Sequence, residues 1–141
     1  MRSQPMRSQP MRMLPLKVLI ADDHEIVRGG VRSILEEHIE LVVVGEISNG
    51  KDAVDEAAVL LPDLIIMDWQ IPALEGLLAA QIIKRRNPEI AILMFSINSG
   101  RQYIELARGM GLDGFIAKDR AATELILAVD AVIHNQKYFP V

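Results

Sequence analysis

Acidic, hydroxyl and basic side chains follow four apolar segments of the sequence, each at the point where its segment ends. They are Asp22 and Asp23 after the first apolar run, Asp68 after the third, Ser96 after the fourth and Lys118 after the fifth. Clustered carboxylates repel one another unless a cation or a shared proton relieves them. Oxygen ligands without cysteine suit a hard ion such as Mg²⁺, and a lysine can meet an anion. If the fold brings them together, these residue types predict a site for a divalent cation and an anion.

The segments that would position these residues alternate between short apolar runs and helical patterns. The runs are mostly continuous, which is typical of strands buried on both faces of a parallel sheet. They cover Leu16–Ala21, Leu41–Ile47, Leu64–Met67, Ile90–Phe95 and Gly114–Ala117. The pattern predicts five strand–helix units in one α/β domain, with right-handed crossovers and helices on both faces of the sheet. Ligands of such a sheet bind beyond the carboxyl ends of its strands, where the polar residues are expected.

Apolar residues at helical spacing predict the helices between the strands. The first stripe includes Ile26, and the third includes Leu74 and Leu78. The predicted helix ends are marked by Pro62, by Asn87 before Pro88, and by Gly111 in a left-handed conformation. Gly29 and Gly30 interrupt the first stripe, and close packing is the only reason we can offer for them.

Length and composition restrict the class of protein. Half of the 141 residues are apolar, which is enough for one hydrophobic core. The chain contains no cysteine, which excludes a disulfide framework or a thiolate metal site. No apolar run approaches the ~20 residues of a membrane helix, and the start lacks the apolar region of a secretory signal. Residues 1–15 repeat MRSQP, contain three arginines and no acid, and are expected to form a flexible tail. The remaining body is acidic, which makes it a poor binder of nucleic acid by itself.

Each candidate residue also has a purely structural interpretation. Asp22 or Asp23 could cap the first helix, and Asp68 could be a turn residue. A serine at a strand end usually bonds nearby backbone, and a lysine usually lies on a solvated face. The conjunction of the right residue types at the ends of four strands favours the functional interpretation.

Other phosphate-binding and catalytic devices are missing from the sequence. The turn after the first strand has no G-x-G-x-x-G fingerprint, and the chain has neither a G-x-x-x-x-G-K-[ST] loop nor a G-x-S-x-G elbow. His24, His38 and His134 lack metal-motif spacing. We interpret His24 as a first-turn helix residue and the other two as surface residues.

At these residues the chain resembles the receiver domains of bacterial two-component response regulators, in the NarL/FixJ (LuxR-type) subfamily. The resemblance runs from Leu16 to about Val141 and is carried by VLIADDHEIVRGGVRSIL, DLIIMDWQIPALEG, ILMFSINSG and GLDGFIAKD. It implies a flavodoxin-like doubly wound sheet with strand order 2-1-3-4-5. It also implies a receiver domain over residues 16–136, followed at 137–141 by the start of a linker to a helix-turn-helix DNA-binding domain that is absent from this sequence.

The resemblance also assigns roles to the residues at the strand ends. Asp68 would accept a phosphoryl group from a sensor histidine kinase. Mg²⁺, or Mn²⁺ in its place, would be held directly by Asp23, Asp68 and the backbone carbonyl of Gln70, and through water by Asp22. Lys118 would pair with the phosphoryl oxygens, Ser96 would be the switch hydroxyl, and Phe115 would be the aromatic residue that moves inward behind it.

The function implied is a cytoplasmic signalling switch rather than an enzyme, with chemistry limited to its own phosphorylation and dephosphorylation. Phosphorylation would alter the face formed by the fourth helix, fifth strand and fifth helix, with homodimer formation as one outcome. DNA would be bound only through the absent domain, and no membrane is involved.

Two alternatives remain. Ile97 follows Ser96 where the family usually has a small residue, which favours a phosphorylation-independent interaction module. A phosphohydrolase with an aspartyl nucleophile is the enzyme alternative, but such enzymes carry D-x-D after the first strand, and this chain has Asp22-Asp23-His24 there.

Overall fold

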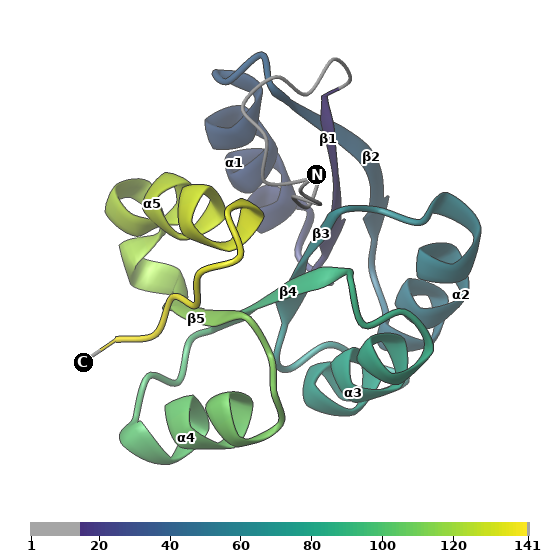
Figure 1. Ribbon diagram of the computed structural model, residues 1–141, viewed down its shortest axis with the longest axis vertical. Helices are drawn as coiled ribbons and strands as arrows, with labels where there is room; N and C mark the ends of the chain where they lie inside the picture. The colour runs from purple at the N-terminus through teal and green to yellow at the C-terminus, as the bar shows by residue number, and fades with distance from the viewer. Residues whose placement is uncertain (1–14, 141) are drawn as a thin grey trace, which may run out of the picture.

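The computed structural model describes residues 15–140, and five strands alternate with five helices along that part of the chain. All strand pairings are parallel, and the sheet has the order β2-β1-β3-β4-β5 (Figure 1). The elements are β1 Leu16–Ala21, α1 Glu25–Glu36, β2 Leu41–Ile47, α2 Gly50–Leu60, β3 Leu64–Asp68, α3 Gly76–Arg86, β4 Ala91–Ser96, α4 Arg101–Gly109, β5 Gly114–Ala117, the 3₁₀ turn η2 Lys118–Arg120 and α5 Ala121–Ile133. The predicted α/β class, five-unit repeat and strand order are confirmed.

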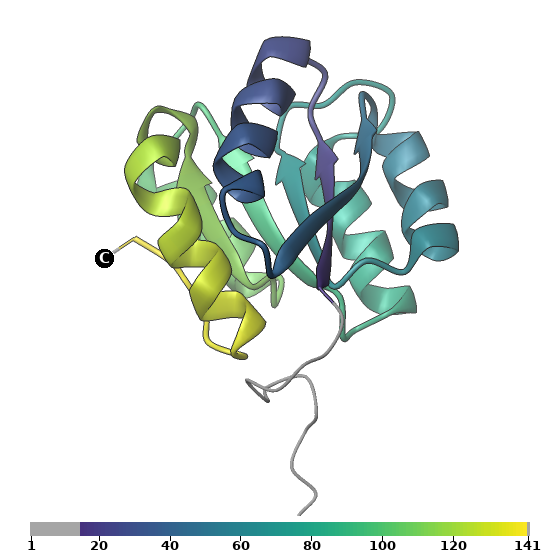
Figure 2. The ribbon, with the colours of Figure 1, turned by 90° about the horizontal axis from the view of Figure 1, so that it is seen from above.

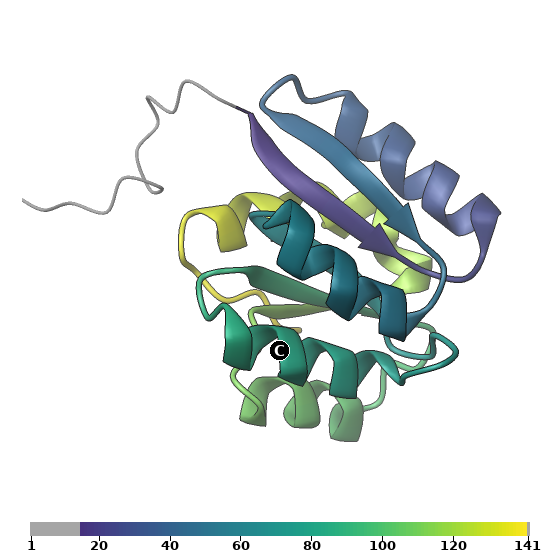
Figure 3. The same ribbon diagram turned by 90° about the vertical axis from the view of Figure 1, so that its right-hand side faces the viewer.

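Helices cover both faces of the sheet. Helices α1 and α5 lie on one face, and α2, α3 and α4 lie on the other (Figures 2 and 3). Side chains alternate along each strand, so that Ile65 and Met67 of β3 join the core beneath α2 and α3, whereas Leu64 and Ile66 join the core beneath α1 and α5. Every residue of β3 is buried, as expected for the central strand of a parallel sheet.

The strand boundaries lie close to the predicted ones. Strand β3 extends one residue further, to Asp68, and β4 begins and ends one residue later, so that Ser96 is its last residue. Both polar residues are therefore fixed by sheet hydrogen bonding rather than placed in mobile loops. Their positions at the strand ends set the geometry of the site described below.

The helix ends follow the predicted breakers. Leu61, the C-cap of α2, adopts a left-handed φ of 46° before Pro62. Asn87 caps α3 immediately before Pro88, and Gly111 has a φ of 76° two residues after the end of α4. These observations confirm all three predicted helix ends.

Some residues of the predicted apolar helix stripes are exposed or lie outside a helix. Ile26 is 89% exposed and Leu78 is 46% exposed, and Leu74 precedes α3. Packing is also the wrong explanation for Gly29 and Gly30, because a Cβ added at either position would meet nothing within 4 Å. The apolar stripes are wider than the surfaces that the sheet covers, so their margins face solvent.

The chain after α5 returns to the sheet. The carbonyl of Tyr138 accepts the N–H of Phe115 at 2.9 Å, and the N–H of Tyr138 donates to the carbonyl of Asp113 at 3.0 Å. The guanidinium carbon of Arg108 lies 4.7 Å from the centre of the Phe139 ring. The division of the chain at residues 16, 136 and 137 stays a prediction, and the expected tail lies outside the described residues except for Pro15. No helix among residues 15–140 is long and apolar enough to cross a membrane.

Candidate metal centre at the carboxyl edge of the sheet

The sheet register brings the predicted site residues to one edge. Ala21 at the end of β1 pairs with Met67 of β3, so Asp22 and Asp68 follow adjacent paired positions. Asp68 itself pairs with Phe95 of β4. Ser96 pairs with Ala117, which directly precedes Lys118. Parallel pairing therefore converts residues far apart in the sequence into neighbours at the strand ends.

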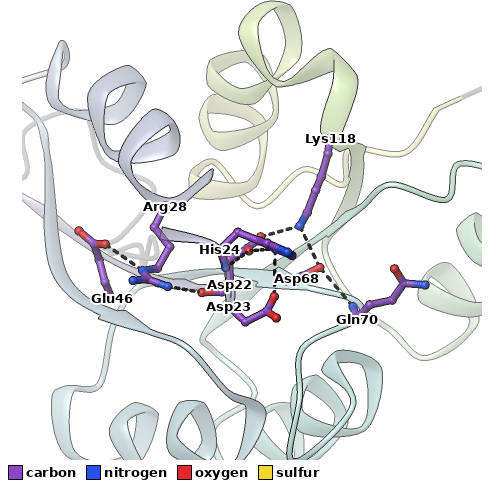
Figure 4. Close-up of polar contacts among 8 residues, drawn as sticks. All are labelled: Asp22, Asp23, His24, Arg28, Glu46, Asp68, Gln70 and Lys118. Atoms are coloured by element: carbon purple, nitrogen blue, oxygen red, sulfur yellow. Dashed lines mark hydrogen bonds and ion pairs between the residues drawn. The ribbon is translucent and has the colours of Figure 1, made fainter. Parts of the chain in front are cut away.

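Three aspartates and one histidine form the centre of the site. Ligand atoms of Asp22, Asp23, His24 and Asp68 all lie within 4.8 Å of one another. Asp22 is 1% exposed and Asp68 is 3% exposed, whereas Asp23 and His24 face solvent. The group therefore has two buried and two solvent-facing members, and Figure 4 shows their side chains next to one another.

Lys118 supplies the positive charge of this site. Its Nζ lies 2.6 Å from Oδ2 of Asp22 and 3.2 Å from Oδ1 of Asp68, and its side chain is only 14% exposed. The 2.6 Å contact is an ion pair without hydrogen-bond orientation, because Oδ2 of Asp22 is buried and accepts no hydrogen bond from residues 15–140. The structural interpretation of Lys118 as a solvated surface residue is thus wrong.

The electrostatics of Asp68 reflect opposing influences. Burial raises the pKa of Asp68, and the negative charge of Asp22 raises it further. The charge and hydrogen bond of Lys118 act against this rise, as does the N–H of Gln70, which donates to Oδ1 of Asp68 at 3.2 Å. The net direction is upward because burial is the largest influence, and the three aspartates of the group still outnumber the single lysine.

This excess of negative charge fits a divalent cation. The donors are carboxylate oxygens, with one imidazole at the rim, and their ligand atoms lie within 4.8 Å of one another. The unsatisfied Oδ2 of Asp22 retains acceptor capacity that a cation or a water bound to it would use. The acidic group can therefore hold a metal ion.

The two aspartates after β1 do not cap the following helix. The N-cap of α1 is His24, whose side chain makes no capping hydrogen bond. Oδ1 of Asp22 instead accepts the N–H of His24 at 2.9 Å, two residues along the chain. This turn holds the carboxylate of Asp22 toward β3 and Lys118 rather than toward the helix.

Ser96 ends β4, and Phe115 lies in the adjacent strand β5. Oγ of Ser96 is buried and accepts the N–H of Asn98 at 2.9 Å, the local bond that the structural interpretation of a strand-end serine predicts. The Phe115 ring is fully buried and meets Trp69 edge-on, with ring centres 6.1 Å apart. Trp69 also meets Tyr103 of α4 at 5.4 Å. These three rings connect the residue after Asp68 to α4 and β5.

Sequence reasoning missed several residues that shape the site. His24 precedes the first turn of α1, and its Nδ1 lies 3.2 Å from Oδ1 of Asp22 and 3.1 Å from Oδ1 of Asp23. Nη1 of Arg28 donates to the backbone carbonyl of Asp22 at 2.7 Å, and its Nε donates to Glu46 at 3.1 Å. The only signal for His24 was its position directly after two aspartates, and Arg28 gave none.

The family model for the response regulator receiver domain matches residues 18–130. Response regulator UvrY of Escherichia coli is 35% identical over 121 residues, covering 86% of this chain and 56% of UvrY, so the chain spans about half the length of that relative.

Two solved structures are also similar to the chain. One is a LuxR-family two-component response regulator from Aurantimonas, with a TM-score of 0.84 and 27% identity, covering 88% of this chain and 89% of that one. The other is the isolated REC domain of RcsB from Salmonella enterica in the presence of the phosphomimetic BeF₃⁻, with a TM-score of 0.84 and 28% identity over 89% and 94% of the two chains. With its parallel five-stranded sheet and acidic edge, this chain belongs to the receiver domains of LuxR/NarL-type response regulators.

Proposed function

We propose that Asp68 accepts a phosphoryl group from the phosphohistidine of a sensor histidine kinase. The observation that carries this proposal is the position of Lys118, whose ammonium lies between two buried carboxylates at the edge of an acidic group. Asp68 is the nucleophile because it ends the central strand, is almost fully buried, and is held by Gln70 and Lys118.

In the transfer, an oxygen of Asp68 attacks phosphorus while the bond from phosphorus to the imidazole nitrogen breaks, and its electron pair stays on that nitrogen. Asp23 and Asp68 directly, with the Gln70 carbonyl, and Asp22 through water, are the groups that would hold Mg²⁺ or Mn²⁺. When bound, this ion offsets the repulsion between carboxylate and phosphoryl group and stabilises charge in the transition state. Lys118 moves from its carboxylate contacts to the new phosphoryl oxygens.

The switch requires contacts that exist in only one state. Ser96 Oγ already accepts the N–H of Asn98, but its hydroxyl proton is free to donate to a phosphoryl oxygen if the loop after β4 moves toward Asp68. Movement of that loop opens space for Phe115, whose ring packs on Trp69. Because these new contacts form only with the phosphoryl group, phosphorylation favours the altered face formed by α4, β5 and α5.

The output would follow from this face. Homodimer formation on phosphorylation and control of a helix-turn-helix DNA-binding domain are the proposed consequences, with DNA bound only by that further domain. The similarity to LuxR-family regulators, with the match covering only 56% of UvrY, supports this proposal. The domain would act in the cytoplasm, with no turnover of an external substrate.

The test is incubation with acetyl phosphate or phosphoramidate, with and without Mg²⁺, followed by intact-mass measurement. We expect a gain of one phosphate that requires Mg²⁺ and is absent in Asp68→Asn. Ile97 is 71% exposed, and Ile97→Ala tests whether its side chain limits donor access. If the parent and Ile97→Ala both fail to form an adduct and both fail to respond to beryllofluoride, a phosphorylation-independent interaction module explains the chain better.

A further inference from the structure

The imidazole of His24 is built into the acidic group. His24 occupies the N-cap of α1 with extended backbone angles, φ −103° and ψ 113°, and its ring turns back toward the carboxylates rather than along the helix (Figure 4). Its Nδ1 lies 3.1 Å from Asp23 and 3.2 Å from Asp22. The other two histidines each meet one carboxylate at a longer distance, His38 at 3.9 Å and His134 at 3.7 Å.

These separations fit donors that share one ion. Zinc binds nitrogen and oxygen at about 2.0–2.2 Å, which places neighbouring donor atoms roughly 3.3 Å apart in a tetrahedron and roughly 3.0 Å apart in an octahedron. The observed 3.1 and 3.2 Å lie between those values. Nδ1 is also within hydrogen-bond distance of Oδ1 of Asp22, and with the ring proton on Nε2 its lone pair faces these carboxylates and can bind an ion.

The carboxylate of Asp22 is buried beside the imidazole. Asp22 is 1% exposed, and its Oδ2 accepts no hydrogen bond within residues 15–140, although it pairs with the Lys118 ammonium. Oδ1 of Asp22 faces the imidazole, so the carboxylate lies between a cation on one side and a nitrogen donor on the other. Asp22 therefore presents a buried carboxylate oxygen to the imidazole nitrogen, on the side away from Lys118.

We infer that His24 gives this centre a nitrogen ligand, so that it binds a borderline divalent transition metal such as Zn²⁺ more tightly than Mg²⁺. Imidazole suits zinc, copper and nickel, whereas Mg²⁺ prefers oxygen donors and keeps several waters. The inference rests on the proposed function, because it uses the same carboxylates, and it names an ion that competes with the activating one. The His24 imidazole would occupy a ligand position on Zn²⁺ that, on bound Mg²⁺, is left to water or to a phosphoryl oxygen. Because that position is then blocked, Zn²⁺ would inhibit phosphorylation.

The test compares Zn²⁺ and Mg²⁺ dissociation constants of the parent chain, His24→Gln and His134→Gln. Zn²⁺ is measured by competition with a chromophoric chelator, and Mg²⁺ by Trp69 fluorescence. We expect His24→Gln to weaken Zn²⁺ binding about tenfold or more while Mg²⁺ binding changes less than about twofold. His134→Gln should change neither, because the ring of that histidine meets the carboxylate and backbone carbonyl of Asp130, which is not part of the acidic group. Equal Zn²⁺ affinity in the parent and His24→Gln overturns the inference.

A measurement on the unaltered chain guards against a folding defect in the variant. In long-range ¹H–¹⁵N spectra of the histidine rings, Zn²⁺ should shift a ring nitrogen of His24, and Mg²⁺ should not. No selective shift of His24 contradicts the inference. If Mg²⁺ still binds and supports adduct formation, the proposed function survives that result; if no divalent ion binds at all, both fail.

Discussion

Gly76 allows α3 to pass close to the peptide of Asp68. A Cβ built on Gly76 would lie 2.0 Å from the carbonyl oxygen of Asp68 and 3.0 Å from Cα of Trp69. Ordinary contacts begin at about 3.4 Å, so Gly76→Ala forces this carbonyl or the start of α3 to move by more than an ångström. The displaced peptide carries the carboxylate that we propose as nucleophile.

The expected loss of stability is about 1–3 kcal/mol, the usual range for overpacking a well-filled site. For a domain of this size, it corresponds to a fall in Tm of about 4 °C for each kcal/mol. A displacement of about 1 Å at a reacting group can slow a reaction ~100-fold, so adduct formation should slow more than the loss of stability alone implies. Urea denaturation and the rate of Mg²⁺-dependent mass gain measure the two effects separately.

Gly29→Ala is the matched control. A Cβ at Gly29 meets nothing within 4 Å, and the residue lies inside α1. Alanine there should stabilise the chain by up to ~1 kcal/mol and leave the phosphorylation rate unchanged. The reasoning is refuted if Gly76→Ala is as stable as Gly29→Ala and is phosphorylated at the same rate.

Three further perturbations follow from described contacts. Burial raises the pKa of Asp68, so the contribution of this carboxyl to stability is present below its unfolded-state pKa and is lost as pH rises through its folded-state pKa. Asp68→Asn should therefore resist urea better than the parent at neutral pH, and this gain in stability should shrink in acid. An equal gain at every pH would contradict this reasoning. Hydrogen bonding to Arg32 lowers the pKa of Glu46, so the contribution of Glu46 to stability is present above its unfolded-state pKa and is lost as pH falls through its folded-state pKa. In thermal melts, Glu46→Gln should destabilise the chain at neutral pH and hardly at all in acid. Lys84→Met removes hydrogen bonds to Asp113 (2.8 Å) and to the carbonyl of Ile90 (2.6 Å), and it should lower the free energy of unfolding by about 1–3 kcal/mol in chemical denaturation. An unchanged midpoint would contradict a stabilising role of Lys84.

The sequence was sufficient to predict the strands and the convergence of the main site residues. Continuous apolar runs ending in Asp22, Asp68, Ser96 and Lys118 indicate parallel strands, and parallel strands place their carboxyl ends at one edge. No detail of side-chain conformation was needed for that conclusion. The role of each residue in phosphoryl transfer came from the family resemblance and is still a proposal.

The remaining features depend on geometry that has no sequence period. Ile26 lies on the uncovered side of α1, and the backbone N–H of His24 is held by Oδ1 of Asp22. The contacts of Trp69 with Phe115 and Tyr103 join three separate elements through ring orientation. Such tertiary contacts are decided by packing, so local patterns do not predict them.

Borohydride trapping tests the central claim most directly, because it reduces an aspartyl phosphate to homoserine and marks the residue that carried the phosphoryl group. After phosphorylation with Mg²⁺, peptide mass mapping should find homoserine at position 68 and unmodified aspartate at positions 22 and 23. Homoserine at either of those two positions, or at none after confirmed phosphate gain, would contradict the assignment of Asp68 as the phosphoacceptor.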